Sequence, residues 1–213
     1  MYFKQNHIKK WEFALLLALC FTVLSGAWAA AGQRELSGKL IRLHVIAVSD
    51  TERDQAAKLR ARDAILELLE PELLGIESRA EAEERIAVLL PAIEEAARGA
   101  AETASGSELG VAATLGREAY PTRYYDGFAL PAGEYLSLRV VLGEGQGKNW
   151  WCVVFPPLCA AAAEGVAGVS GTGVLDDEDV ALISEGDGYE IRFKILEIWG
   201  SVRNFMEEKF NAG

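Results

Sequence analysis

The 213-residue sequence contains only three cysteines and two histidines, which restricts the chemistry it can carry. Cys152 and Cys159 are separated by six residues, so they lack the close C-x-x-C spacing that is typical of zinc sites. We find no motif for a metal ion or a cofactor, and no nucleophile motif surrounds Cys152. A catalytic set of Cys152, His44 and Asp50 is an alternative, because an imidazole can activate a nearby thiol.

The chain also lacks an excess of basic residues. It has 21 Lys and Arg against 32 Asp and Glu, for a formal net charge of −11. Nucleic acids and anionic lipids bind clustered Lys and Arg, so this charge argues against both as main partners. Half of the residues are hydrophobic and a quarter are charged, as in a globular protein, and the length suits one domain.

The N-terminus has the three parts of a secretory signal peptide. Basic residues precede a nearly uncharged stretch, whose most apolar part, FALLLALCFTVL, is twelve residues long. Ala27-Trp28-Ala29 then fits the small-x-small pattern of a cleavage site. The sequence therefore predicts a signal peptide over residues 1–29, with an uncleaved signal anchor as the alternative. In both cases, the rest of the chain is expected to be exported to the far side of the membrane.

Export changes the interpretation of the cysteines. Removal of the signal would take Cys20 away and leave Cys152 and Cys159 as an even pair, in a compartment that permits oxidation. A disulfide between them is the leading hypothesis, and it would add about 2–3 kcal/mol on the loop-entropy account. The alternatives are two reduced thiols that pack as small apolar groups, the catalytic set, and a metal clip.

A strand and a helix are predicted at the start of the exported part. Residues 39–50, KLIRLHVIAVSD, have apolar side chains on both faces, which indicates a strand that is covered on both sides. Ser49 and Glu52 have the spacing of a capping box, so a helix is expected from Ser49 to about Glu70, ending before Pro71.

A second helix is predicted over residues 78–104. Ser78 and Glu81 form another possible capping box at its start. Pro91 lies inside it, so we expect a kink or two shorter helices. Its predicted apolar face consists of Ile86, Leu89, Leu90 and Ile93.

The middle of the chain has the alternating pattern of strands. Residues 109–115 and 136–142 alternate cleanly, and residues 120–135 suggest a hairpin or a long connection, with Asp126-Gly127 as a turn. With WWCVVF as a third strand, the short links predict an antiparallel meander. An amphipathic helix is expected at the C-terminus.

The predicted fold class is α+β: a strand and helices, then the meander, then the C-terminal helix, all after the signal or anchor segment. The expected organisation is a signal or anchor at 1–29 and an α+β domain at 38–159. A flexible low-complexity segment with a possible short helix follows at 160–188, and the C-terminal helix occupies 189–213.

Polar side chains of the first helix have two interpretations. Gln55, Lys58 and Arg62 are spaced three and four residues apart, as on one solvated stripe. Asp63 is unusual because it lies on the predicted apolar face, between Leu59 and Leu66. It either bonds to Arg42 or to backbone, or it is a recognition carboxylate.

The pair Trp150-Trp151 is also open to two interpretations. In a central strand both rings would be core residues. At a sheet edge one ring could anchor a partner, because tryptophan is enriched at interface hot spots.

Three stretches resemble the stage II sporulation protein R family of endospore-forming bacteria. They are KLIRLHVIAVSD, DQAAKLRARDAIL and LPAGEYLSLRVVLGEGQGKNWWCVVFPPLC, and the resemblance spans roughly residues 38–159. The family-motif residues, as candidates for partner binding, are His44, Ser49, Asp50, Asp54, Gln55, Lys58, Arg62, Asp63, Trp150, Trp151, Pro156 and Pro157, together with Cys152 and Cys159.

This resemblance implies a signalling protein rather than an enzyme. Members of the family are made in the forespore and exported into the space between forespore and mother cell. There they are required to activate a membrane-embedded aspartic protease, which processes the precursor of sigma-E. The resemblance thus implies that this protease is the partner, and that the membrane is contacted only through the N-terminal segment.

Two other functions are compatible with the residues. One is an exported hydrolase acting on cell-wall material, with acid/base candidates Asp50, Asp63, Glu134 and Glu144. It requires two of these carboxylates to lie close together. The other is a structural envelope protein without a specific receptor.

Overall fold

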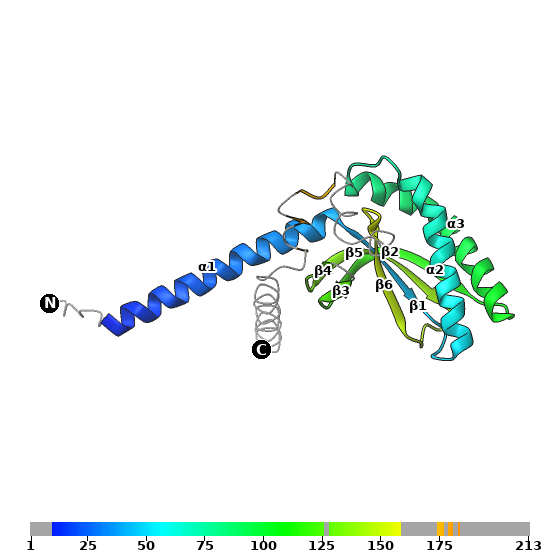
Figure 1. Cartoon of the computed structure of the whole chain (residues 1–213), viewed down its shortest axis with the longest axis horizontal. Coiled ribbons are helices and arrows are strands. Elements are labelled where there is room, and N and C mark those ends of the chain that lie inside the picture. Colours follow the sequence, from blue (N-terminus) through cyan, green and yellow to red (C-terminus); the bar gives the residue numbers. More distant parts are fainter. Residues whose placement is uncertain (1–9, 126–127, 159–173, 177–178, 181–182, 184–213) are drawn as a thin grey trace, which may run out of the picture.

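The computed structural model describes residues 10–125, 128–158, 174–176, 179–180 and 183. The elements are α1 (Lys10–Lys39), β1 (Ile41–Ile46), α2 (Glu52–Leu73), α3 (Arg79–Ser105), β2 (Val111–Tyr120), β3 (Arg123–Tyr125), β4 (Phe128–Leu130), β5 (Gly133–Leu142) and β6 (Asn149–Phe155). Two helices, α2 and α3, pack on one face of a four-stranded sheet, and α1 leads away as a long rod (Figure 1). The predicted α+β class is confirmed.

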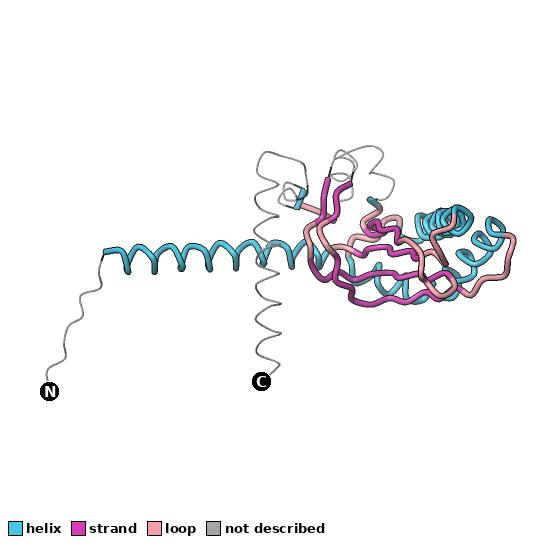
Figure 2. Tube along the Cα trace, turned by 90° about the horizontal axis from the view of Figure 1, so that it is seen from below, coloured by secondary structure: helices cyan, strands magenta, loops and turns pink. Residues whose placement is uncertain are grey.

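The strand order is β2-β5-β1-β6, so the N-terminal strand lies in the interior of the sheet. Figure 2 shows the long helix α1 projecting away from the strands and from the other two helices. β1 pairs in parallel with β5 and antiparallel with β6, while β2 pairs antiparallel with β5. The expected meander is therefore present only in β2 and β5, because β1 separates β5 from β6. Five of the six β1 residues are buried, as its two apolar faces predicted.

The start and end of α2 differ from the prediction. Thr51 is the N-cap, and its side chain accepts a hydrogen bond from the backbone N–H of Asp54. Ser49 is not the cap, because its hydroxyl donates to the Asp54 carboxylate at 2.5 Å. The helix also continues through Pro71 to Leu73, which is buried and gives the last turn a packing contact.

The buried face of α2 is the row Ala57, Ala61, Ile65 and Leu69. These residues are four apart and therefore stack along one side of the helix. The prediction that Leu59 shares the apolar face is wrong, since this side chain is 39% exposed. Asp63 is likewise exposed, so it does not lie on the apolar face.

The second predicted helix, α3, is one continuous helix. Ser78 caps it as predicted, with its side chain accepting from the backbone N–H of Glu81. Pro91 does not split it into two helices, because its ring lies on the exposed side, where water can hydrate the carbonyl that loses its partner. Ile86 and Ile93 from the predicted apolar face are fully buried, and Leu89 and Leu90 are partly buried.

The other face of the sheet has a smaller apolar cluster at one end. It is formed by β3 and β4, the last turns of α1 and a short segment near residue 180; its members include Leu36, Tyr120, Phe128, Tyr135 and Leu175. β3 and β4 pair antiparallel, so the predicted hairpin is confirmed. Its expected turn, Asp126-Gly127, lies outside the described residues.

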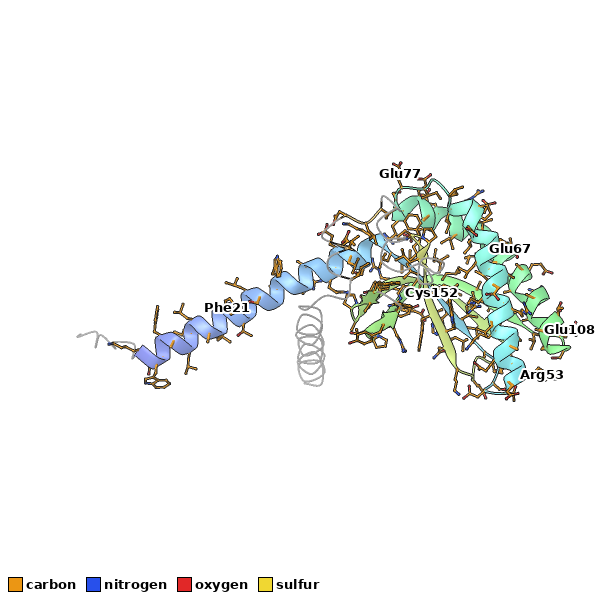
Figure 3. All side chains as sticks on the ribbon, viewed as in Figure 1. Phe21, Arg53, Glu67, Glu77, Glu108 and Cys152 are labelled. Carbon is orange, nitrogen blue, oxygen red and sulfur yellow. The ribbon has the colours of Figure 1, made fainter. Side chains whose placement is uncertain are left out.

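The helix α1 has two different halves. Its N-terminal half exposes large apolar side chains such as Phe21, which is 74% exposed and projects from the rod (Figure 3). By length and composition this helix could cross a membrane. Its last turns pack on the domain, with Leu36 fully buried. Residues 33–38 are helical and belong to the domain, because Leu36 is a member of its smaller apolar cluster.

An ionic cluster ties the end of α1 to the segment near residue 180. The Lys39 ammonium contacts Asp176 at 2.8 Å and Asp179 at 2.6 Å. Asp179, Val180 and Ile183 are helical, in the segment where a short helix was expected. Of the predicted segment 160–188, the structure describes residues 174–176, 179–180 and 183, and the predicted C-terminal helix at 189–213 lies outside the described residues.

Candidate functional site

Five of the motif residues build the turn between β1 and α2: Ser49, Asp50, Asp54, Gln55 and Lys58. Asp50 accepts a hydrogen bond from the backbone N–H of Lys148 at 2.7 Å. The Gln55 amide donates to the Ser49 carbonyl at 2.8 Å. The Lys58 ammonium donates to the Gln55 side-chain oxygen at 2.7 Å and to the Lys148 carbonyl at 3.0 Å. These bonds fasten the turn to the loop between β5 and β6.

Lys58 has a structural role in this cluster. The residue is only 5% exposed, and burial lowers the pKa of its amine, an effect that nearby Asp50 opposes. A side chain so enclosed offers little surface to a partner. In this part of α2, the predicted polar stripe is therefore not simply solvated: Gln55 and Lys58 hydrogen-bond to the β1–α2 turn and to the β5–β6 loop.

Arg62, Asp63 and Trp150 form a second group, on the helix side of the sheet. Asp63 pairs with its neighbour Arg62, whose Nε donates at 2.8 Å, and the Arg62 guanidinium lies 4.8 Å from the Trp150 ring centroid. The suggested bond from Asp63 to Arg42 is wrong. Arg42 extends from the opposite face of the sheet, since it neighbours Leu43 on β1 and successive side chains alternate.

His44 and Trp151 belong to a third group, on the face of the sheet away from α2 and α3. We call it the polar face; its residues are Arg42, His44, Glu118, Tyr120, Arg123, Ser137, Arg139, Asn149 and Trp151. His44 and Trp151 are directly paired across β1 and β6, with ring centroids 5.5 Å apart. The motif thus supplied two members of this face, and the fold supplies the others.

Glu118 is the centre of the polar face. Its carboxylate contacts His44 Nδ1 at 3.2 Å, the Tyr120 hydroxyl at 3.3 Å and Arg139 Nε at 3.4 Å. His44 Nε2 lies 3.1 Å from Asn149 Oδ1, which extends the network to β6. Four strands therefore contribute to one connected set of polar groups.

Arg42 is the least expected member. It is fully buried, donates to the Tyr125 hydroxyl at 2.7 Å, and its guanidinium lies 3.9 Å from the Tyr120 ring centroid and 5.0 Å from that of Tyr135. Its Nε and Nη1 atoms have no hydrogen-bond partner among the described residues. The available signal was an arginine inside a strand predicted to be covered on both sides, because such a charge needs a special environment.

Neither the set of Cys152, His44 and Asp50 nor a pair of Asp50 and Asp63 is assembled in the described residues. Cys152 pairs with Leu43 on the helix side of the sheet, whereas His44 lies on the polar face and Asp50 is bonded to the β5–β6 loop. Asp50 and Asp63 are separated by about three turns of α2, roughly 16 Å along the axis at 1.5 Å per residue. Paired glycosidase carboxylates lie about 5–9.5 Å apart, so these two do not form such a pair.

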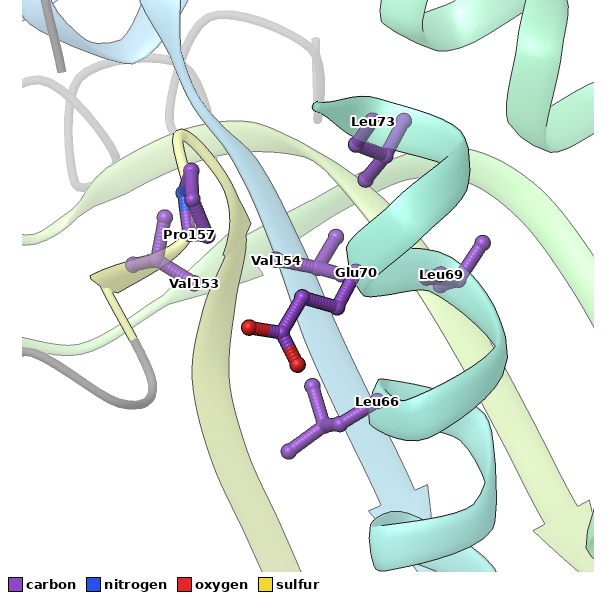
Figure 4. Close-up of a pocket in the computed structure, with 7 residues that line it drawn as sticks. All are labelled: Leu66, Leu69, Glu70, Leu73, Val153, Val154 and Pro157. Carbon is purple, nitrogen blue, oxygen red and sulfur yellow. The ribbon is translucent and has the colours of Figure 1, made fainter. Parts of the chain in front are cut away.

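Pro156 and Pro157 end β6 in a turn, and the Phe155–Pro156 peptide bond is cis. Pro157 lines a small pocket of about 70 Å³ between β6 and α2, with Leu66, Leu73 and Val154 (Figure 4). Pockets for drug-sized ligands are several times larger, about 300–1,000 Å³. This pocket is too small to hold a substrate of that size.

Cys152 is nearly buried in β6, at 5% exposure. Its predicted partner, Cys159, lies outside the described residues. The disulfide between them stays a prediction.

The buried tyrosines make stability depend on alkaline pH. Burial raises the pKa of Tyr120, Tyr125 and Tyr135 above the ordinary value of 10.0. The folded state therefore keeps these phenolic protons at a pH where the unfolded chain releases them. Their contribution is complete below pH 10 and is lost as pH rises further. The lowered pKa of Lys58 has the opposite effect: the free energy of unfolding rises as pH approaches 10.5, because the unfolded chain then holds a proton that the folded chain has released. This is one group, against three tyrosines whose effect lowers stability.

We expect the free energy of unfolding to fall steeply above pH 10. Urea unfolding followed by circular dichroism between pH 8.5 and 11.5 would measure it. Tyr120→Phe should make the fall shallower, whereas Tyr124→Phe, at a side chain that is 63% exposed, should keep the wild-type slope. Equal slopes for all three proteins would contradict the role of the buried phenols.

These features define an α+β domain that follows a helix able to cross a membrane, with a polar and aromatic face on its sheet. The family model for stage II sporulation protein R (spore_II_R) matches residues 37–164, more than half of the chain. Stage II sporulation protein R of Bacillus subtilis (strain 168) is 35% identical over 150 residues, which cover 65% of this chain and 66% of that protein, slightly less than two thirds of its length. No solved structure matches the chain. The chain belongs to the stage II sporulation protein R family.

Proposed function

We propose that this chain is an exported intercellular signal of endospore formation. It is made in the forespore and crosses the forespore membrane into the space between the two cells. There it activates the membrane-embedded aspartic protease that processes the sigma-E precursor in the mother cell. The observation that carries the proposal is the apolar helix directly before the family region, because a signal between two cells must leave the cell that makes it.

Activation requires no chemistry from the signal itself. A ligand shifts its receptor between inactive and active states by binding the active state more tightly, and the shift cannot exceed that difference in affinity. A rigid domain with a preformed surface suits this role. Its sheet and helices share a continuous core, so little order has to be gained on binding.

The boundary between export signal and domain supports a released form. The small-x-small pattern ends at Ala29, whereas Leu36, seven residues later, is already fully buried in the domain. Cleavage after Ala29 would therefore leave the contacts of Leu36 with the domain intact. An uncleaved α1 would instead keep the same domain at the membrane surface.

Deletion of residues 2–29 should abolish sigma-E processing in sporulating cells that carry this chain in place of their own. The domain would still fold but would stay in the forespore. The measurement is an immunoblot for the sigma-E precursor and product. As the matched control, an unrelated cleavable signal peptide joined at Ala30 should restore processing. Full processing by the deleted form would overturn the proposal.

A further inference from the structure

We propose that the polar face is the surface that binds the receptor, and that the receptor presents carboxylates to it from an acidic segment. This inference rests on the proposed function and deepens it by naming the surface and the chemistry of the partner. It is carried by three observations: the exposure of this face, its charge, and the buried cation beneath it.

The polar face is accessible where the small apolar cluster ends. Thr114, Gly116 and Asn149 are exposed there, and the Arg139 side chain is 47% exposed. The opposite face of the sheet is closed by α2 and α3 (Figure 1). A partner can therefore reach the sheet only from this side among the described parts of the chain.

The charge of this face is opposite to that of the rest of the molecule. Its permanent charges are Arg42, Arg123 and Arg139 against the single carboxylate of Glu118. By contrast, α2 and α3 carry twelve acidic and seven basic residues, and the whole chain has a net charge of −11. An acidic segment would be repelled by the helical side and attracted to this face, so charge alone fixes the orientation of docking.

Arg42 places a positive charge under the surface that no described carboxylate neutralises. A buried cation without a counter-ion costs free energy, and an apolar side chain would suit the core better. Its field is weakly screened because the surroundings are apolar. Arg123, on the same face, also has a buried Nε without a partner among the described residues. Both guanidinium groups therefore favour an anion on this face.

The side chains around these charges are those that dominate protein interfaces. The Arg123 guanidinium lies 3.7 Å from the Trp151 ring centroid, and Trp151 in turn neighbours His44. Tryptophan, tyrosine and arginine are the residue types most enriched at hot spots. Trp151 is only partly buried, so part of its side chain is exposed on this face.

Charge reversal at Arg139 tests the proposal. Arg139→Glu places a second carboxylate beside Glu118 on the exposed part of the face, and it should weaken receptor binding by roughly tenfold or more. Arg139→Gln, which only removes the charge, should weaken it less. The matched control is Arg117→Glu: this residue is exposed on the neighbouring strand β2, but it pairs with Leu136 on the other face of the sheet.

The full chain is tested in two measurements, one in mild detergent and one in cells. The first is binding to the full-length detergent-solubilised protease, over a range of salt concentrations. The second is sigma-E processing in sporulating cells. We expect Arg139→Glu to lose both, Arg139→Gln to bind with a smaller salt dependence, and Arg117→Glu to match wild type within about twofold. Circular dichroism checks that each variant is folded. Should Arg139→Glu fail to fold, the comparison of Arg139→Gln with wild type tests the proposal instead.

The outcomes separate this inference from the proposed function. If wild type binds and all three variants bind equally well, the polar face is not the receptor surface, while the signalling role stands. If Arg117→Glu is as defective as Arg139→Glu, binding follows net charge and not this face, which also overturns the inference. If wild type neither binds the protease nor supports processing, the proposed function fails, and the receptor assigned to this face fails with it.

Discussion

Leu36→Ala should lower the free energy of unfolding by about 2–5 kcal/mol, the usual cost of truncating a fully buried leucine. Leu36 has no exposed surface and packs with Leu40, Tyr135 and Val153 in the cluster under the hairpin. Its removal leaves a cavity that links α1 to the sheet. The expected result is therefore a large loss from a residue that lies just after a predicted signal peptide.

The matched control is Leu24→Ala, twelve residues earlier in the same helix. The chemical change and the effect on helix propensity are the same, but Leu24 is 70% exposed. We expect a change in domain stability of less than about 0.5 kcal/mol. Both variants would be unfolded with urea as full-length chains in mild detergent and followed by circular dichroism. Similar values for the two would show that α1 does not pack on the domain through Leu36.

Gly147→Ala should cost about 2–3 kcal/mol through overpacking. A Cβ atom at this position would lie 2.3 Å from the Ser49 carbonyl oxygen and 2.9 Å from Ala47 Cβ. The contact is with backbone, so no side chain can rotate away. Relief requires the loop to move, and that would break the hydrogen bond from the Gly147 N–H to the Ala47 carbonyl, now 2.9 Å.

Gly110→Ala is the control for this substitution. A Cβ at Gly110 meets nothing within 4 Å, and its backbone is not left-handed. We expect its stability to stay within about 0.5 kcal/mol of wild type. Urea midpoints at pH 7 would compare the two. If Gly147→Ala were as stable as Gly110→Ala, this result would contradict the close contact between Gly147 and the β1–α2 turn.

Local patterns predicted the elements better than their arrangement. The alternation in β2 and β5, the apolar faces of β1 and the Ser78 cap are all set by neighbours in the sequence, and all are present. The strand order is not local, because the insertion of β1 between β5 and β6 depends on pairing with residues about a hundred positions away. The row Ala57–Ala61–Ile65 was missed because larger leucines dominate a hydrophobic pattern, although small residues let neighbouring elements approach most closely.

The candidate site shows the same division. His44 and Trp151 were selected from the sequence, but Glu118, Arg139 and Asn149 join them only through strand pairing. Conversely, Ser49, Asp50 and Lys58 were selected as candidates for binding, and the structure shows that they also bond the β1–α2 turn to neighbouring segments. A sequence motif selects residues that are important for the fold or for the function. The contacts of each residue in the structure are needed to distinguish the two roles.

The central position of β1 has a consequence for how the domain would form after the export proposed above. A chain that crosses a membrane from its N-terminus presents β1 first, yet His44 of β1 bonds Asn149 of β6, 105 residues later. Before β5 and β6 have emerged, this apolar strand has no neighbour on either edge, and such long-range pairing is slow. The helices α2 and α3 emerge next and can form a hairpin from local contacts alone. This helical hairpin would cover one face of β1 before β5 and β6 are available for pairing. The order of elements along the chain would therefore limit the aggregation of the unpaired strand while the chain crosses the membrane.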